Sequence, residues 1–380
     1  MINIAIHGHF YQPPREDPWT GTVLHDPTAA PAHDWNERVC SECYLPNSCA
    51  RILGMDGRIK TEINNYARLS FNFGPTLHRW IENHSPSLNK TLIESQSRAI
   101  AQAYNHIIMP LASERDKLTQ TVWGMEDFKY RFGRAPKGMW LPETAVDIPT
   151  LETLAARGVE FTILAPHQCR AVIIDSSPVL TSRGANLDVT RPYRCELPSG
   201  RSITIIFYHA GLAQGIAFGG LLNNGDLFKD AAVRAAAEGE DRILVTATDG
   251  ESYGHHHKFG EMALARMFEQ MELDERINLP SIEEFLKKHP PTASCLIEEN
   301  TSWSCAHGIE RWRSDCGCHT GGETGWNQEW RGPLREAFDN LAAAVDELFE
   351  EKISPYGDPW QLRNEAIELY RCGLTLSEEE

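Results

Sequence analysis

Short runs of hydrophobic residues alternate with longer amphipathic segments along most of the chain. Runs rich in β-branched and aromatic residues are typical of buried strands, and they occur at residues 2–6, 70–73, 138–141, 160–164, 203–208, 242–247 and 295–297. Apolar residues at helical spacing predict helices near 77–80 and at 125–132, 148–157, 227–237 and 262–271, whereas 99–104 fits either element. Seven or eight such units in about 300 residues predict an α/β fold whose parallel strands close into a barrel.

Two segments depart from this alternation. Residues 171–201 are rich in Ser, Arg and Pro, and we interpret them as an excursion inserted into the barrel. Beyond the barrel the pattern turns wholly helical, with helices expected at 334–352 and 359–372. We therefore expect a TIM-like barrel domain over residues 1–325 and a C-terminal helical extension over residues 326–380.

The charge balance restricts the partners of the protein. The 380 residues include 53 Asp and Glu against 36 Lys and Arg, a formal net charge of −17. A surface this acidic repels phosphate backbones and anionic lipids, which argues against nucleic acid and membranes as partners. The chain has neither an apolar run of membrane-spanning length nor a secretory signal at its N-terminus. We expect a cytoplasmic protein with a neutral ligand.

Ten cysteines are too few for a disulfide-rich scaffold of this length, but two groups of them are closely spaced. The pair Cys40-x-x-Cys43 is half of a common zinc site, and a second such pair is missing. The other group is formed by Cys305, His307, Cys316, Cys318 and His319. Its spacing is compatible with a structural metal, a disulfide or redox pair, or reduced thiols, and the sequence does not choose among them.

Polar and titratable residues follow most of the predicted strands. In a parallel barrel the carboxyl ends of the strands converge on one face, where barrel enzymes carry their sites. Several separate strands that each end on such a residue are therefore expected to build one site. The residues are His7, His9, Gln12, Glu143, His167, His209, Asp249, Glu251 and His255.

Two of these acids have surroundings that suit catalysis. Glu143 lies in Trp140-Leu-Pro-Glu143, where apolar neighbours would shield one side of the carboxylate and disfavour its charged form. Asp249 is followed by a glycine, which allows the backbone to turn sharply beside the acid. Two carboxyl groups facing each other across a sugar are the basic requirement for cleaving a glycosidic bond. Trp140 and Trp303 add aromatic faces that suit the apolar C–H surface of a pyranose ring.

Five segments, in this order, resemble the sequence motifs of glycoside hydrolase family 57. They are His7-Gly-His9-Phe-Tyr-Gln12-Pro, His106-Ile-Ile-Met-Pro, Trp140-Leu-Pro-Glu143, Asp249-Gly-Glu251-Ser-Tyr-Gly and Thr-Ser-Trp303. The first differs from the family pattern by two residues placed before Gln-Pro. Each motif alone is weak, but the ordered set, which spans residues 1 to about 330, is specific.

The resemblance implies a retaining α-glucan-active enzyme on a (β/α)7 barrel followed by a helical region. Glu143 would be the nucleophile and Asp249 the acid/base of a double displacement without metal or other cofactor, and Glu143 or Glu251 would raise the pKa of Asp249. The residues expected to bind sugar are His7, His9, Gln12, His106, Trp140, His167, His209, Glu251, His255 and Trp303. The segment 305–319 is foreign to the well-studied amylolytic members and resembles an uncharacterised branch, so neither linkage nor the choice between hydrolysis and transfer follows.

Two other classes of protein remain compatible with these residues. A metal-dependent carbohydrate deacetylase, or an α-mannosidase-like zinc enzyme, could bind its metal through Asp249 and the histidines of the first two motifs. No Asp-Asp pair follows the first strand, which counts against the deacetylase, and the zinc content of the purified protein separates the classes. A non-catalytic glucan-binding protein on the same fold would have no use for an intact pair of acids.

Overall fold

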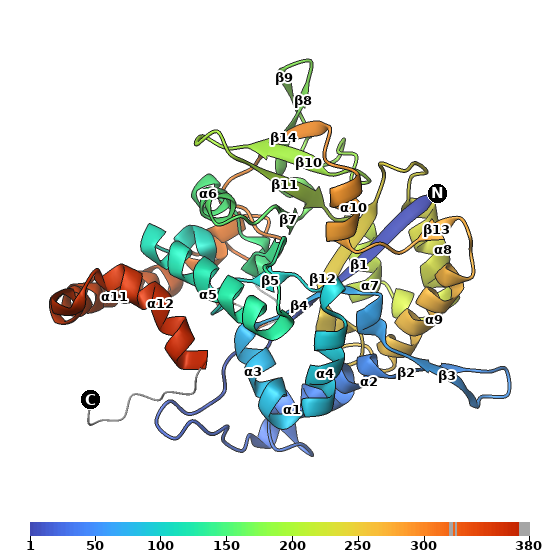
Figure 1. The fold of residues 1–380 in the computed structure, drawn as a ribbon, viewed down its shortest axis with the longest axis horizontal. Coiled ribbons are helices and arrows are strands. Elements are labelled where there is room, and N and C mark those ends of the chain that lie inside the picture. Colours follow the sequence, from blue (N-terminus) through green and yellow to red (C-terminus); the bar gives the residue numbers. More distant parts are fainter. Residues whose placement is uncertain (319–321, 324, 372–380) are drawn as a thin grey trace.

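Short parallel strands form a barrel at the centre of the computed structural model, which describes residues 1–318, 322–323 and 325–371 (Figure 1). The barrel strands are β1 (Ile2–Phe10), β4 (Ser70–Phe73), β5 (Ala101–Gln102), β6 (Met139–Trp140), β7 (Phe161–Leu164), β11 (Ser202–Phe207) and β12 (Leu244–Asp249). Each overlaps a run predicted from the sequence, and the ambiguous segment at 99–104 contains a strand.

Neighbouring barrel strands are parallel and follow one another in chain order. β1 pairs with β4 and β12, β5 pairs with β6, and β7 pairs with β11. Isolated parallel bridges from Phe71 to Ala99 and from Gly138 to Phe161 join the pairs into one wall. The wall closes where the amide of His209, just after β11, donates to the carbonyl of Val245 in β12 at 2.7 Å. The carboxyl ends of the strands therefore meet on one face, as expected for a (β/α)7 barrel.

Helices follow most of the strands and cover the outside of the barrel. Residues 1–318 contain α1 (Trp35–Val39), a π-helix (Cys40–Tyr44), α2 (Leu45–Ser48), α3 (Pro75–His84), α4 (Pro86–Glu94), α5 (Glu114–Phe132), α6 (Ile148–Ala156), α7 (Ala210–Ala217), α8 (Gly225–Ala235), α9 (Gly260–Glu272) and α10 (Ile282–Lys288). Their starts carry sequence signals: the side chains of Ser113 and Asp147 accept backbone N–H groups at the first turns of α5 and α6.

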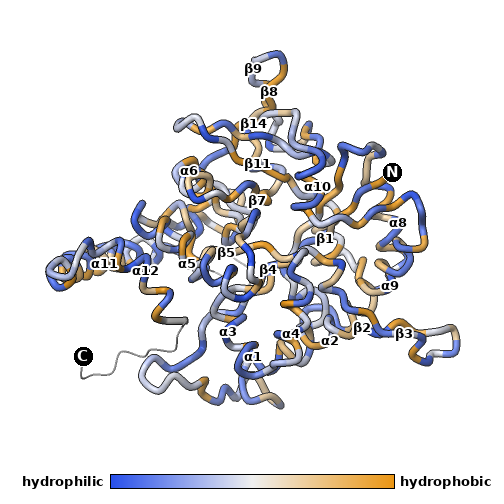
Figure 2. Tube along the Cα trace, viewed as in Figure 1, coloured by the Kyte–Doolittle hydropathy of each residue, from blue (hydrophilic) through white to orange (hydrophobic). Residues whose placement is uncertain are grey.

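The barrel strands are hydrophobic because helices cover their outer face and side chains fill the inside. All residues of β1, β4 and β7 are buried. Figure 2 shows the corresponding concentration of hydrophobic residues along the central strands. The polar residues within these runs, among them His7, His9 and Asn72, are buried as well. Buried polar side chains need hydrogen-bond partners, which indicates a polar network inside the barrel.

A six-stranded sheet extends from one side of the barrel, in the order β7-β11-β10-β14-β8-β9. It adds β8 (Cys169–Ile174), β9 (Ser177–Leu180), β10 (Tyr193–Glu196) and β14 (Ala293–Ile297). The segment 171–201 thus contributes the β8–β9 hairpin, at the top of Figure 1, and β10. Placing the run at 295–297 in the barrel was wrong, since β14 pairs with β10 and β8. A short apolar run predicts burial but not which strands it joins.

The remaining strands lie outside the barrel wall. β2 (Ala50–Leu53) and β3 (Ile59–Ile63) form an antiparallel hairpin, and β13 (Ile277–Asn278) pairs with the first residues of β1. The hairpin projects from the body of the protein at the right of Figure 1.

Two long helices, α11 (Arg331–Ile353) and α12 (Pro359–Arg371), match the helices predicted after the barrel. α12 packs on α5, where the indole N–H of Trp123 donates to the carbonyls of Arg363 and Asn364 at 3.0 and 3.1 Å. Figure 1 shows both helices at the left edge of the molecule. The domain boundary at residue 325 stays a prediction. Within the described residues, every helix is too short or too polar to cross a membrane.

Candidate active site

The carboxyl ends of β1 and β12 place His9 beside Asp249. The two strands are parallel, and His9 is the partner of Asp249 in their ladder. The chain then turns through Gly250, where an added Cβ would lie 2.3 Å from the ring of Phe10. Only glycine allows the turn to fold this closely over β1 and keep Asp249 at the end of its strand.

Asp249 as a residue is accessible to solvent, but protein atoms closely surround its carboxyl group and largely bury it. This burial raises the pKa of Asp249, and the negative charge of Glu143 raises it further, to about 6. Trp303 relates the two acids: its indole N–H donates to Glu143, and its ring lies 6.4 Å from that of His9, the ladder partner of Asp249. Asp249 therefore keeps its proton up to about pH 6, as a general acid requires.

Glu143 lies in a tight turn that follows β6. The backbone φ angles of Glu143 and Thr144 are +57° and +50°, a left-handed conformation that is rare for residues with a side chain. The amide of Trp303 donates to the Glu143 carbonyl at 3.1 Å and to the Thr144 hydroxyl at 2.9 Å. The indole N–H of Trp303 donates to Oε2 of Glu143 at 3.2 Å. These contacts hold a strained turn, a feature common at functional sites.

A chain of hydrogen bonds joins three histidines inside the barrel. Nδ1 of His7 contacts the Ser70 hydroxyl at 3.0 Å, and its Nε2 contacts Oδ1 of Asn72 at 3.1 Å. The Asn72 amide donates to Nδ1 of His9 at 3.0 Å. Nε2 of His9 lies 3.0 Å from Nε2 of His106, which completes the chain.

Asn72 fixes the protonation pattern of this chain. Its oxygen accepts from Nε2–H of His7, and its nitrogen donates to Nδ1 of His9, so the single proton of neutral His9 is on Nε2. His9 then donates to Nε2 of His106, which places the His106 proton on Nδ1. Burial lowers the pKa of His7 to about 3 and that of His106 to about 4. The network therefore ends at a neutral, half-buried His106 of defined tautomer.

Tryptophan rings pack around this network. Trp140 is fully buried and stacks on the rings of His7 and His9, each at 5.0 Å between centroids. Trp303 packs edge-on against Trp140 at 5.0 Å and is half-buried. Trp140 thus supports the histidines from behind, and Trp303 connects them to the Glu143 carboxylate.

The sequence model of one known family covers this arrangement except for Trp303. Glycosyl hydrolase family 57 matches residues 1–298, a span that contains Glu143, Asp249 and the three histidines. The chain belongs to glycosyl hydrolase family 57. The resemblance found in the sequence motifs is confirmed. A second model, named Domain of unknown function (DUF3536), matches residues 326–374, where α11 and α12 lie.

Family 57 relatives are similar to this chain at low identity. An alpha-amylase of Pyrococcus abyssi is 22% identical and a 4-alpha-glucanotransferase of Thermococcus litoralis 21% identical, each over 251 residues, 62% of this chain and 36% of the relative. The chain thus spans little more than a third of these relatives. An exo-type maltose-forming amylase from Pyrococcus sp. ST04 has a TM-score of 0.75 at 14% identity, over 99% of this chain and 69% of that one. A branching enzyme from Pyrococcus horikoshii has a TM-score of 0.60 at 15% identity, over 82% and 75%. These structures establish the shared fold.

Three residues of this family 57 site were missed from the sequence. Asn72 organises the histidines, Tyr11 stacks on His106 at 3.7 Å, and the pKa of Tyr208 is raised by burial and by the nearby charge of Asp249. Asn72 offered a signal, because it is polar and lies between two phenylalanines in a predicted strand. Tyr11 and Tyr208 offered none, since a single sequence does not separate them from aromatic residues of the core.

Two predicted sugar-binding histidines have structural contacts. Nε2 of His167 lies 2.9 Å from the carbonyl of Ser302 and so supports the segment that carries Trp303. Nδ1 of His209 accepts the amide of Leu212 at 3.1 Å and caps the first turn of α7. A direct contact of either histidine with sugar stays a prediction.

Gln12 and His255 lie farther out. The Gln12 oxygen accepts from Arg15 at 2.9 Å in the segment after β1. His255 pairs with Glu42 at 2.5 Å and lines a surface pocket next to the β2–β3 hairpin. The structure therefore separates His255 from the network around His9, and its contact with substrate also stays a prediction.

Glu251 is buried beneath the site. Its Oε1 accepts from the Tyr44 hydroxyl at 2.6 Å and from the Tyr11 amide at 3.1 Å. Burial raises the pKa of Glu251 to about 8; the Tyr44 hydrogen bond opposes this shift and the charge of Asp249 adds to it. Glu251 is therefore protonated at neutral pH, and of the two acids expected to raise the pKa of Asp249, Glu143 is the one that does so.

Glu251→Gln is expected to make the stability of the protein less dependent on pH. A carboxyl whose pKa is raised by folding favours the folded state fully below the unfolded pKa, and this contribution is lost as the pH rises from about 4.5 to about 8. Gln keeps the acceptor oxygen but does not ionise. Urea unfolding at pH 5 and pH 8 should show a fall in the free energy of unfolding smaller by on the order of 3 kcal/mol in the variant. Glu62→Gln, at an exposed position of β3, is the control; equal falls in both variants would contradict the prediction.

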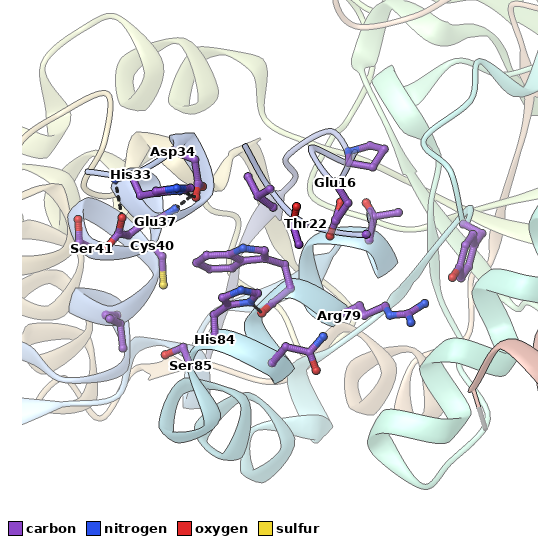
Figure 3. Close-up of a pocket in the computed structure, with 18 residues that line it drawn as sticks. Glu16, Thr22, His33, Asp34, Glu37, Cys40, Ser41, Arg79, His84 and Ser85 are labelled. Carbon is purple, nitrogen blue, oxygen red and sulfur yellow. Dashed lines mark hydrogen bonds and ion pairs between the residues drawn. The ribbon is translucent and has the colours of Figure 1, made fainter. Parts of the chain in front are cut away.

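A separate pocket of about 950 Å³ is lined by polar and apolar residues alike and contains neither Glu143 nor Asp249 (Figure 3). In it, His33 bonds to Asp34 at 2.9 Å and, through its amide, to Glu37 at 2.6 Å. The charged groups along this part of the wall are thus engaged with one another. The other labelled residues are Glu16, Thr22, Cys40, Ser41, Arg79, His84 and Ser85.

Proposed function

We propose that this chain is a retaining enzyme that acts on α-glucan by double displacement. The observation that carries the proposal is the pairing of Glu143, bound by the Trp303 indole, with Asp249, whose pKa is raised to about 6. One acid held for attack and one that keeps its proton is the division that retaining glycosidases require. Membership of family 57, with relatives named alpha-amylase and 4-alpha-glucanotransferase, supports the same reaction.

In the first step the Glu143 carboxylate attacks the anomeric carbon and forms a glycosyl ester. The bond from that carbon to the glycosidic oxygen breaks, and Asp249 donates its proton to the leaving oxygen. Esterification removes the negative charge of Glu143, which is one of the two causes of the raised pKa of Asp249. The pKa of Asp249 therefore falls as it changes from acid to base.

In the second step Asp249 takes a proton from the acceptor, whose oxygen attacks the anomeric carbon and releases Glu143. Water as acceptor gives hydrolysis, and a sugar hydroxyl gives transfer to a new or branched chain. Neutral His106, whose Nδ1–H is not used by the network, would hold the sugar through a hydrogen bond that strengthens as the ring flattens toward the oxocarbenium ion. Both ring nitrogens of His9 are engaged, with Asn72 and His106, so His9 would act by fixing the tautomer of His106. His7 and Trp140 are buried and act as positioning residues behind them.

The contacts of the histidines favour this reaction over metal-dependent deacetylation. Both ring nitrogens of His7 are engaged, with Ser70 and Asn72. Within the described part of the chain, the group of metal-ligating side chains that converges is the one around Cys305, and it includes none of His9, His106 and Asp249.

Product analysis tests the proposal. Maltooligosaccharides, amylose and glycogen are each incubated with the protein, and products are separated by chain length. Shorter reducing chains alone would indicate hydrolysis, whereas longer chains or new branches would indicate transfer. Glu143→Ala serves as the inactive control. If no glucan changed length or branching under conditions where the protein is folded, the chain would instead be a glucan-binding protein.

The pH profile is expected to report the proton of Asp249. Because the acid must be protonated, kcat/KM should fall tenfold per pH unit above a pKa of about 6. The histidines of the network do not account for such a limb, since the pKa of His106 is about 4. The limb should move little with temperature, as carboxyl ionisation has a small enthalpy. A limb that moved strongly with temperature would assign the proton to an imidazole.

A further inference from the structure

Three cysteines and one histidine converge on the loop after β14. The Cys305 sulfur lies 3.9 Å from that of Cys316 and 3.8 Å from that of Cys318. Nδ1 of His307 lies 3.8 Å from the Cys305 sulfur and 3.3 Å from the Cys318 sulfur. All four atoms are within 4.8 Å of one another. His319, the other histidine of this sequence segment, lies outside the described residues.

These distances match the edges of a tetrahedron around one metal ion. Zinc binds thiolates at about 2.3 Å and imidazoles at about 2.0–2.1 Å, which places sulfur atoms about 3.8 Å apart and sulfur about 3.5 Å from nitrogen. A disulfide would instead bring two sulfurs to about 2.05 Å, and the third would be left over. We propose a structural zinc site formed by Cys305, His307, Cys316 and Cys318.

The loop is shaped to present these ligands. The amide of His307 donates to the Cys305 sulfur at 3.3 Å, a contact that stabilises a thiolate. The chain turns at Gly308 with φ of +64°, and a Cβ there would lie 2.0 Å from the carbonyl of Asn300. Three soft thiolates and one imidazole select zinc over the hard cations magnesium and calcium. Four protein ligands leave no open position, so the ion is structural and not catalytic.

The zinc site would secure the segment that carries Trp303. Cys305 is two residues from Trp303, and a backbone bridge joins Cys305 to Ser302. At its other end the same segment contacts Glu143 through both the amide and the indole of Trp303. Zinc binding itself does not depend on the proposed function. Its effect on turnover rests on that function, through Glu143.

Metal content tests the site without any assay of activity. The full chain, purified without chelator and with its thiols reduced, should contain about one zinc ion per chain by plasma mass spectrometry. Cys318→Ser should bind zinc at least about tenfold more weakly in competition with a chelator, because a lost ligand weakens binding by at least as much as a lost supporting contact. Cys49→Ser is the matched control, since Cys49 is a free thiol outside the cluster.

Two further measurements keep the test decisive. If Cys318→Ser does not fold, the absorption spectrum of the wild-type chain with Co²⁺ in place of zinc tests the site instead. Three thiolates around Co²⁺ should give charge-transfer bands and the intense visible bands of a tetrahedral site. Zinc removal should also speed hydrogen exchange of the amides in residues 302–318 by about tenfold or more and leave β1 unchanged.

Three results would overturn the site. The first is a reduced wild-type chain that neither contains nor takes up zinc. The second is a disulfide among the three cysteines that forms in preference to metal binding. The third is zinc that Cys318→Ser retains and His9→Gln loses, which would place the metal inside the barrel and favour the deacetylase. Loss of zinc from Cys318→Ser with turnover unchanged would leave the site standing and bear only on its link to the proposed function.

Discussion

Glu143→Ala is expected to lower kcat on maltooligosaccharides by about 10⁴-fold or more, because no glycosyl ester forms without the attacking carboxylate. The smaller side chain leaves room for azide on the same side of the sugar. With an aryl α-maltooligoside, azide should restore turnover and give a β-glycosyl azide in one displacement. The rate and the anomeric configuration of the product, by NMR, check the prediction.

Glu62→Ala is the matched control for this experiment, since Glu62 is exposed on the β2–β3 hairpin. Its kcat should equal that of the wild type. Glu143→Gln, which preserves the shape of the side chain, should be as inactive as Glu143→Ala but should not respond to azide. If the kcat of Glu143→Ala were still a tenth of the wild-type value, Glu143 would not be the residue that attacks the sugar.

Asp249→Asn is expected to act selectively on poor leaving groups. The kcat/KM of the variant for unactivated maltooligosaccharides should fall about 10³-fold, because the leaving oxygen departs unprotonated. Its kcat/KM for a dinitrophenyl glycoside should fall about tenfold or less. The glycosyl ester then accumulates, since no base activates water. Steady-state rates and mass spectrometry of the ester check both effects.

The azide product separates the two acids. In Asp249→Asn, azide attacks the accumulated ester and should give an α-glycosyl azide, the opposite anomer from that expected with Glu143→Ala. Asp241→Asn, at an exposed position before β12, should behave as the wild type. Equal losses on both substrates, with rescue of neither variant, would withdraw the roles assigned to Glu143 and Asp249 and favour the glucan-binding alternative.

The barrel could be predicted because each of its strands is a short apolar run with a helix after most of them. Seven such runs are enough to predict a parallel barrel, since buried parallel strands are hydrophobic on both faces. The same logic failed for β14, which is equally apolar but pairs in the side sheet. Residues 35–48 were also missed, because their short helices, one of them a π-helix, do not repeat long enough to show a period.

The acids of the site were visible as motifs, whereas their environment was not. The raised pKa of Asp249 depends on crowding and on Glu143, more than a hundred residues earlier in the chain. Likewise, the tautomers of His9 and His106 depend on Asn72, which lies on a different strand. Among the residues near Cys305, the spacing left two histidines as candidate ligands, and the fold brings His307 to the sulfurs.

The left-handed turn at Glu143 and Thr144 sets stability against activity during evolution. Glycine adopts such φ values at little cost, so Glu143→Gly would relieve strain at the very position whose carboxylate the proposed reaction needs. A mutant library selected only for heat resistance should therefore be enriched in inactive variants with glycine at position 143. A lineage that no longer needed turnover would be expected to accumulate the same substitution. The left-handed turn at Glu143 is therefore expected to persist only under selection for enzymatic activity as well as for stability.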